Sequence, residues 1–345
     1  MDYLKMQRIL DDFLKNKESS NSEKIQSLAL SPEEEKEFKK FLEIRSKIPE
    51  QIESGKAEDF CIAEDNYELA AMLISEGIHR NKFPRFLFKY ISIEYFLKSI
   101  EGEYLWFSEF ETLNKNNNEE GFDPIDYSRM TSCEIINYYT YCAKKHEKHP
   151  PFPKKEELEN PETMKKYHEI IKVMTKSTRD STKILSLTTD SKNQKMWEVY
   201  AEHGKGICIE LDMMEYPQLF LIPEKVKYVP ELVPDMTLME RVENPKKYIG
   251  KSVATKLECR WGYECEYRII KFNNTSNEQF FKNKNIIKSI TFGGECSDDC
   301  FKEVVSLLKK HNYPNSTEIK RMKRNTPMDT EFVGILQDIK LKQWK

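Results

Sequence analysis

The sequence predicts an α+β fold, in which helices and strands come in runs of uneven length. Residues 1–80 have a helical pattern, short strand patterns begin at Phe86, and strands dominate from Lys183 onward. Strands and helices do not alternate regularly, as they would in a doubly wound parallel sheet. With 345 residues, of which 39% are hydrophobic, the chain can bury one large core with appendages, or two cores.

Residues 1–80 are predicted to form a helical appendage to a main domain at 81–345. A helix start stands at Ser31, followed by Pro32 and Glu34. The polar stretch 18–24 and the loop 54–59 separate the helices. An apolar stripe then follows at Phe38, Phe41, Leu42 and Ile48. This stripe suits either packing on the main domain or assembly into a homo-oligomer.

The main domain begins with a predicted strand at 86–90, a short helix at 92–99 and a second strand at 104–108. Residues 115–180 form a helical insertion, in which the proline-rich loop 149–157 interrupts the helices. The later strands are predicted at 183–188, 206–211, 225–229, 263–272, 286–292 and 318–323, with a helix at 298–311.

Charge and composition exclude several classes of protein. Lys and Arg number 55 against 58 Asp and Glu, so a net charge of −3 gives no overall basic field for nucleic acid. No apolar run approaches the 18 or so residues of a membrane helix, and the amino terminus has no signal core. We therefore expect a cytoplasmic protein without a membrane partner, whose eight cysteines are reduced thiols.

Two local basic clusters suit either a nucleic-acid acceptor or a solvated surface. They are Lys144, Lys145, His146, Lys148 and His149, and then Lys309, Lys310, His311, Lys320, Arg321, Lys323 and Arg324. The histidines and cysteines do not reproduce paired zinc-ligand spacing, so no metal site is expected.

The stretch 196–212, MWEVYAEHGKGICIELD, places Trp197, Tyr200 and His203 on a helix directly before a Gly-x-Gly turn and a strand. Aromatic and imidazole side chains at a strand edge can hold a flat ring or a nucleotide. Alternatively, Trp197 and Tyr200 anchor the helix to the core, and His203 caps its last carbonyls.

Glu264 and Glu266 are predicted to share one face of the strand at 263–272, because side chains alternate along a strand. Such a carboxylate pair can stabilise a developing oxocarbenium charge in glycosidic chemistry. The alternative is an exposed strand face on which the two acids pair with Lys271, Arg268 or another cation. Arg268 itself suits either a phosphate or an internal ion pair.

Four further residues are candidates for nucleotide binding. Lys89 suits a phosphate and Tyr90 a base, although a snorkelling lysine and a core tyrosine fit the pattern equally. Ser108 and Asn114 can hydrogen-bond a ribose or a carboxamide, or their own backbone in a turn.

Five blocks in order resemble the signature of the bacterial domain-of-unknown-function family 2971. They are FKYISIEYFLKSIEGEYLWFSEFETLN, ILSLTTDSKNQKMWEVYAEHGKGICIELD, KVKYVPE, KLECRWGYECEYRII and IIKSITFGG. The resemblance covers roughly residues 86–335. Members usually carry Asn-Asp-Pro-Phe after the second strand, whereas here only Asn114 matches, so that loop would grip a ligand differently.

The layout is also similar to that of ADP-ribosyltransferase-like proteins, including DNA-modifying toxins. This similarity implies a split mixed or antiparallel sheet, NAD bound as a substrate in its cleft, and Glu266 on the nicotinamide ribose while the glycosidic bond breaks. It implies a bacterial toxin or anti-phage effector that modifies a nucleic-acid or protein acceptor. The alternative is a catalytically silent module that binds a nucleotide or a partner.

Overall fold

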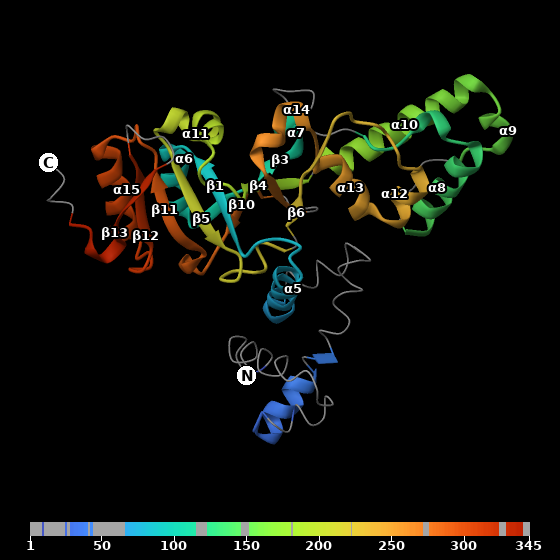
Figure 1. Ribbon diagram of the computed structural model, residues 1–345. Coiled ribbons are helices and arrows are strands. Elements are labelled where there is room, and N and C mark those ends of the chain that lie inside the picture. The colour runs from blue at the N-terminus through green and yellow to red at the C-terminus, as the bar shows by residue number, and fades with distance from the viewer. Residues whose placement is uncertain are drawn as a thin grey trace.

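The fold is a mixed α+β architecture, seen in a computed structural model (Figure 1). The structure describes residues 9, 25, 28–40, 42–43, 66–114, 123–145, 152–180, 182–221, 223–271, 276–323 and 329–340.

The largest feature is a nine-stranded, mostly antiparallel sheet with the order β13-β12-β11-β5-β1-β4-β9-β6, in which β3 also pairs with β4. Its strands are β1 Phe86–Ile91, β3 Ser108–Glu109, β4 Lys183–Thr188, β5 Ile207–Asp212, β6 Glu224–Lys225, β9 Glu266–Lys271, β11 Ile287–Phe292, β12 Glu318–Met322 and β13 Thr330–Ile335. Two small sheets accompany it, made of β2 Tyr104–Trp106 with β10 Glu278–Phe280, and of β7 Lys227–Val229 with β8 Thr255–Leu257.

The α-helices that follow the amino-terminal segment are α5 Tyr67–His79, α6 Ile93–Gly102, α7 Phe110–Asn114, α8 Ser132–Lys145, α9 Lys155–Leu158, α10 Pro161–Asp180, α11 Gln194–Tyr200, α12 Leu238–Glu243, α13 Pro245–Val253, α14 Glu258–Trp261 and α15 Asp298–Lys310. Short 3₁₀ turns are η1 Tyr127–Arg129, η2 Glu202–Gly204, η3 Gly262–Glu264, η4 Lys284–Ile286 and η5 Leu336–Asp338.

The large sheet splits between β1 and β4. β1 pairs with β5 along its whole length, from Phe86 opposite Asp212 to Ile91 opposite Ile207. Its pairing with β4 is confined to Phe88 opposite Thr188. Beyond that pair the two strands separate, so the sheet consists of two halves that meet at one register position.

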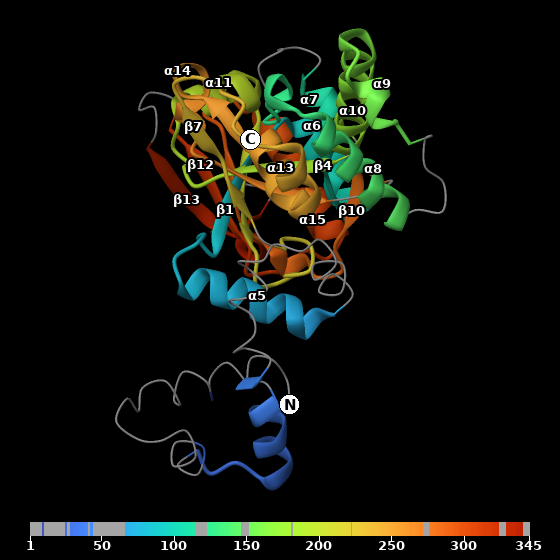
Figure 2. The same ribbon diagram turned by 90° about the vertical axis from the view of Figure 1, so that its right-hand side faces the viewer.

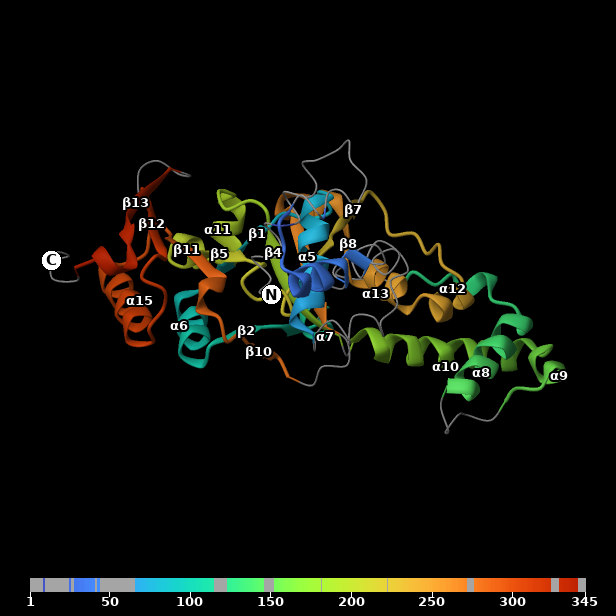
Figure 3. The same cartoon turned by 90° about the horizontal axis from the view of Figure 1, so that it is seen from below.

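One hydrophobic core nevertheless lies beneath both halves. It contains Leu87 of β1 and Leu185 of β4, together with Phe96 of α6 and Phe301 of α15. Helices α6 and α15 therefore cover one face of the sheet, while α11 lies on the opposite face (Figure 3). The split is closed from below by packed apolar side chains, and it opens on the side of α11.

A helical lobe extends from the half of the sheet that contains β4, β9 and β6 (Figure 1). Helices α8 and α10 pack with α12 and α13 around a second core that includes Tyr138, Tyr139, Ile171 and Tyr248. Helices α12 and α13 were not predicted from the sequence, so the lobe combines the expected insertion with a second segment from later in the chain.

At the amino terminus, the predicted helix start at Ser31 is confirmed. The Glu34 amide donates to Ser31 Oγ at 3.3 Å, and the Ser31 amide donates to Glu34 Oε2 at 3.0 Å. Helix α5 lies below the sheet (Figure 2), and its Ile74 packs in the main core. The predicted polar stretch 18–24, the loop 54–59 and two stripe residues, Phe41 and Ile48, lie outside the described residues.

Most of the predicted strands are present, but two of them are divided between different sheets. The stretch 104–108 gives β2 in a small sheet and β3 in the large one, and the stretch 225–229 gives the end of β6 and then β7. The edge strand β13 was not predicted. In each case the pairing partner decides whether a segment forms a strand and which sheet it joins, and a local sequence pattern does not contain that partner.

The predicted Gly-x-Gly turn is present, but its two glycines serve different purposes. Gly204 has a φ of +80°, as expected for a residue chosen for backbone freedom. Gly206 is needed for space, because a Cβ there would lie 2.5 Å from the Ile91 carbonyl oxygen. Gly293, after β11, meets the same turn, and a Cβ there would lie 2.0 Å from the Gly204 carbonyl oxygen.

Candidate functional site

A cavity of about 230 Å³ lies at the split of the sheet, on the α11 side. Its walls come from β1, β3, α7, β4, α11, β8, η3 and β9. Seven of the ten residues predicted for the site line it, namely Lys89, Tyr90, Ser108, Tyr200, Glu264, Glu266 and Arg268. Segments far apart in the sequence therefore converge on one hollow.

The predicted strand placement of Glu264 is wrong. Glu264 ends the 3₁₀ turn η3, Cys265 has a left-handed backbone with a φ of 46°, and β9 begins only at Glu266. The sequence pattern missed this irregularity, because Glu-Cys-Glu-Tyr-Arg also fits a regular strand. Both carboxylates still face the cavity, where they meet the same cation.

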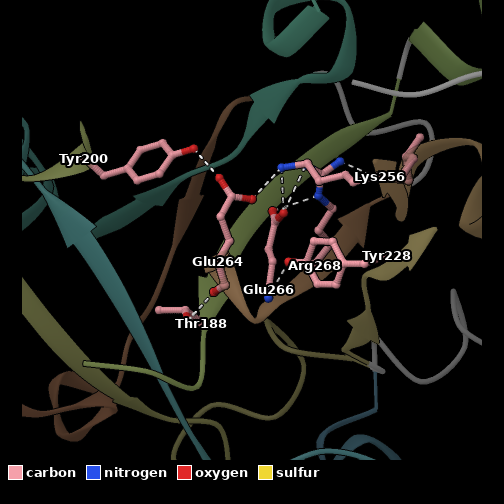
Figure 4. A network of polar contacts seen from close by, with 8 residues as sticks. Thr188, Tyr200, Tyr228, Lys256, Glu264, Glu266 and Arg268 are labelled. Atoms are coloured by element: carbon pink, nitrogen blue, oxygen red, sulfur yellow. Dashed lines mark hydrogen bonds and ion pairs between the residues drawn. The ribbon is translucent and has the colours of Figure 1, made fainter. Parts of the chain in front are cut away.

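That cation is Lys256 of β8, which the sequence reading did not single out (Figure 4). Its Nζ lies 2.7 Å from Oε2 of Glu264 and 2.9 Å from Oε2 of Glu266. Arg268 Nε donates to Glu266 Oε1 at 2.8 Å, and Arg268 Nη1 donates to the Val253 carbonyl. The alternative is therefore right about ion pairs with Arg268 and with another cation, but wrong about exposure, since these side chains are buried.

The two carboxylates have opposite electrostatic environments. Burial disfavours the charge of Glu266, but Arg268 and Lys256 outweigh burial, so the pKa of Glu266 falls to about 2. Burial and the neighbouring Glu266 raise the pKa of Glu264, although Lys256 opposes this. Glu266 is thus ionised at neutral pH, and Glu264 is the stronger base of the pair.

Tyr200 links α11 to this network. Its hydroxyl donates to Oε1 of Glu264 (Figure 4), while its side chain remains 38% exposed. Burial raises the pKa of Tyr200, and the adjacent Glu264 raises it further. Tyr200 therefore stays protonated and serves as a hydrogen-bond donor at the cavity wall.

Lys89 is a half-buried cation with no ion pair or hydrogen bond to any residue within the described ranges. It lines the cavity because the strands have separated beside it. Burial lowers the pKa of Lys89 to about 8, even though the charge of Glu266 acts in the opposite direction. The other two cations of the wall, Lys256 and Arg268, are matched by two carboxylates. With Lys89, the wall therefore has one more positive group than negative groups.

Three predicted site residues are not shown lining the cavity. Trp197 is buried and packs edge-on against Tyr90 at 5.1 Å, which is the anchoring role given as its alternative. His203 is exposed in a left-handed turn. Asn114 ends α7, and its side chain lies outside the described part of the chain.

No protein-family model, curated protein or solved structure matches the chain. The role of the cavity therefore rests on its own residues.

Beyond Lys256, the sequence reading also missed Ser186 and Tyr228. Ser186 of β4 hydrogen-bonds Glu266, and the Tyr228 hydroxyl accepts from the Glu266 amide at 3.0 Å. Both residues are common types in strands, so only their position beside the carboxylate distinguishes them. Lys256, in contrast, heads the block KLECRWGYECEYRII that contains both acids, and this proximity was an available signal.

The described residues contain no cluster of metal-ligating side chains and no helix long and apolar enough to cross a membrane. In the carboxy-terminal basic cluster, Lys320 lies 2.8 Å from Glu318 and Arg321 lies 2.7 Å from Asp298. Lys309 donates to a backbone carbonyl. In the other cluster, His146, Lys148 and His149 lie outside the described residues.

Proposed function

We propose that the cavity binds a phosphate-bearing nucleotide, with NAD as the specific candidate. The observation that carries the proposal is that Lys89, which has no ion pair or hydrogen bond to any described residue, lines the same cavity as a carboxylate pair within a split sheet. The excess positive charge of the wall complements an anionic ligand. The choice of NAD in particular takes up the expected similarity to ADP-ribosyltransferase-like proteins, and that similarity is itself part of the proposal.

The size of the cavity limits what it can enclose. Its volume of about 230 Å³ is below the roughly 300–1,000 Å³ of typical ligand pockets. It therefore accommodates one half of a dinucleotide, and the other half would lie outside. Tyr200, which is partly exposed on the wall, supplies aromatic surface for a ring. Tyr90 is buried against Trp197 and donates to the Asp190 carbonyl, which is the core role given as its alternative.

The two carboxylates suit transfer or hydrolysis at the nicotinamide–ribose bond. That bond breaks with its electron pair leaving on nicotinamide, and a lone pair of the acceptor forms the new bond to the ribose carbon. Glu266 remains ionised and stabilises the positive charge that develops on the ribose. Glu264, the stronger base, takes the proton that the acceptor loses. A role as a bacterial toxin or anti-phage effector would follow from this activity.

A second candidate function is binding without catalysis. It is favoured by the saturation of Glu266, both of whose oxygens are held by Arg268 and Lys256. A carboxylate held in this way supports the architecture even if it never contacts a reacting sugar.

The test is to incubate purified protein with NAD and to follow nicotinamide release by chromatography, with binding measured by calorimetry. Release in the native protein and its loss in Glu264→Gln support the enzyme. Binding of NAD without release of nicotinamide supports the second candidate function, binding without catalysis. Neither binding nor release, in protein shown to be folded, would rule out NAD.

Binding of NAD should weaken as the pH rises through about 8, because Lys89 then loses its charge. Lys89→Met should bind about 10-fold more weakly at pH 7 and lose this pH dependence. Lys89→Arg should retain binding at pH 9, since arginine stays protonated. Calorimetry from pH 6 to 9 measures these effects, with Lys205→Met as a control at an exposed lysine. If Lys89→Met shows the same pH dependence, the group that titrates is a residue other than Lys89.

A further inference from the structure

Lys256 occupies an unusual position for a lysine. Its side chain is only 2% exposed, and its Nζ also lies 4.7 Å from the centre of the Trp261 ring. A buried ammonium is costly unless its partners are well placed, and here it binds one oxygen of each acid. Two carboxylates this close in a buried site would otherwise repel each other.

The small sheet that carries Lys256 contacts Glu266 through both the backbone and the side chain of that residue. Tyr228 of β7 accepts a hydrogen bond from the Glu266 backbone amide, while Lys256 of β8 binds the Glu266 side chain. The strands β7 and β8 pair in register, with Tyr228 opposite Lys256. The β7–β8 sheet thus places a hydroxyl and an ammonium on the same glutamate.

We infer that Lys256 is a positioning residue, which holds Glu264 and Glu266 so that both carboxylates face the cavity. The inference rests on the proposed function, because the roles of the two acids come from it. Lys256 acts through the carboxylates and does not need to contact the ligand. Since it binds both acids, its loss affects both of them together.

Lys256→Met tests the inference, because methionine keeps much of the side-chain length and removes the charge. Without the ammonium, the titration midpoint of at least one of the two glutamates should rise by about 1–3 pH units, followed by NMR of carboxyl-labelled protein. The turnover number for NAD should fall about 100-fold, with little change in KM. Lys251→Met is the matched control, since Lys251 pairs with Asp235 at an exposed site.

The native protein supplies a measurement that needs no variant. The ζ-ammonium protons of Lys256 should exchange with water far more slowly than those of Lys251. Exchange as fast as at Lys251 would overturn the inference, and so would native titration midpoints or native turnover in Lys256→Met.

These results separate the inference from the proposed function. The titration and exchange measurements use no ligand, so they can succeed even if the native protein never cleaves NAD. Conversely, cleavage of NAD by the native protein and by Lys256→Met at equal rates would support the function and reject the positioning role.

Discussion

Replacing Glu266 by glutamine should lower the free energy of unfolding by about 3–5 kcal/mol, because it leaves Lys256 and Arg268 buried without their full counter-charge. The same change at Glu264 should alter stability little at pH 7, or increase it. Burial and Glu266 already disfavour the charge of Glu264, and Lys256 keeps Glu266 as a partner. Urea unfolding of the two variants measures the contrast.

The pH dependence follows from the same shifts. The pKa of Glu266 is about 2 in the folded protein against an ordinary 4.5, so its stabilisation is present above pH 4.5 and is lost as the pH falls toward 2. Glu266→Gln should flatten that acid limb. The raised pKa of Glu264 acts in the opposite direction, because the stability it favours is lost as the pH rises. Equal destabilisation by both variants at pH 7 would contradict this assignment.

Replacing Gly293 by alanine should destabilise the protein by about 3 kcal/mol or more, because the new Cβ would overlap a backbone oxygen that cannot move alone. The Gly293 amide donates to the Gly206 carbonyl, and the Glu295 amide donates to the Gly204 carbonyl. A displaced residue 293 therefore disturbs both of these hydrogen bonds.

Gly204→Ala is the control on the opposite side of the contact. Its φ of +80° makes alanine unfavourable by about 1–2 kcal/mol, but the nearest atom to a Cβ there is a flexible Glu295 carbon at 3.8 Å. Thermal unfolding should rank Gly293→Ala well below Gly204→Ala. The reverse order would show that backbone conformation, and not close contact, limits this turn.

Local sequence patterns predicted the elements whose signals are local. The helix opened by Ser92, the helix predicted at 298–311 and the apolar strand Lys183–Thr188 form as expected. Pairing partners determine the elements that were missed or misassigned, such as β13 at the edge of the sheet and the division of 225–229 between β6 and β7. A single chain segment does not record which other strand will lie beside it.

For the site, residue chemistry was easier to predict than geometry. Lys89, Tyr200 and Glu266 were chosen because their side chains suit a nucleotide, and all three line the cavity. The left-handed Cys265 was not predictable, because Glu-Cys-Glu-Tyr-Arg also fits a regular strand. Lys256 was missed although it lies in the same sequence block as both acids, because its pairing with them depends on how β8 is placed beside β9. Trp197 shows the opposite case, since an aromatic residue suited to a ligand packs instead on Tyr90.

The one-sided split of the sheet has a mechanical consequence. Apolar side chains from both halves interlock beneath it, and a close-packed interior resists shear and expansion. The gap between β1 and β4 should therefore keep a fixed width, because the two halves of the sheet cannot separate without disrupting the apolar layer that joins them. A ligand would have to fit this gap without any movement of the two halves of the sheet. Rigid analogues of the ligand should therefore bind no more weakly than flexible ones.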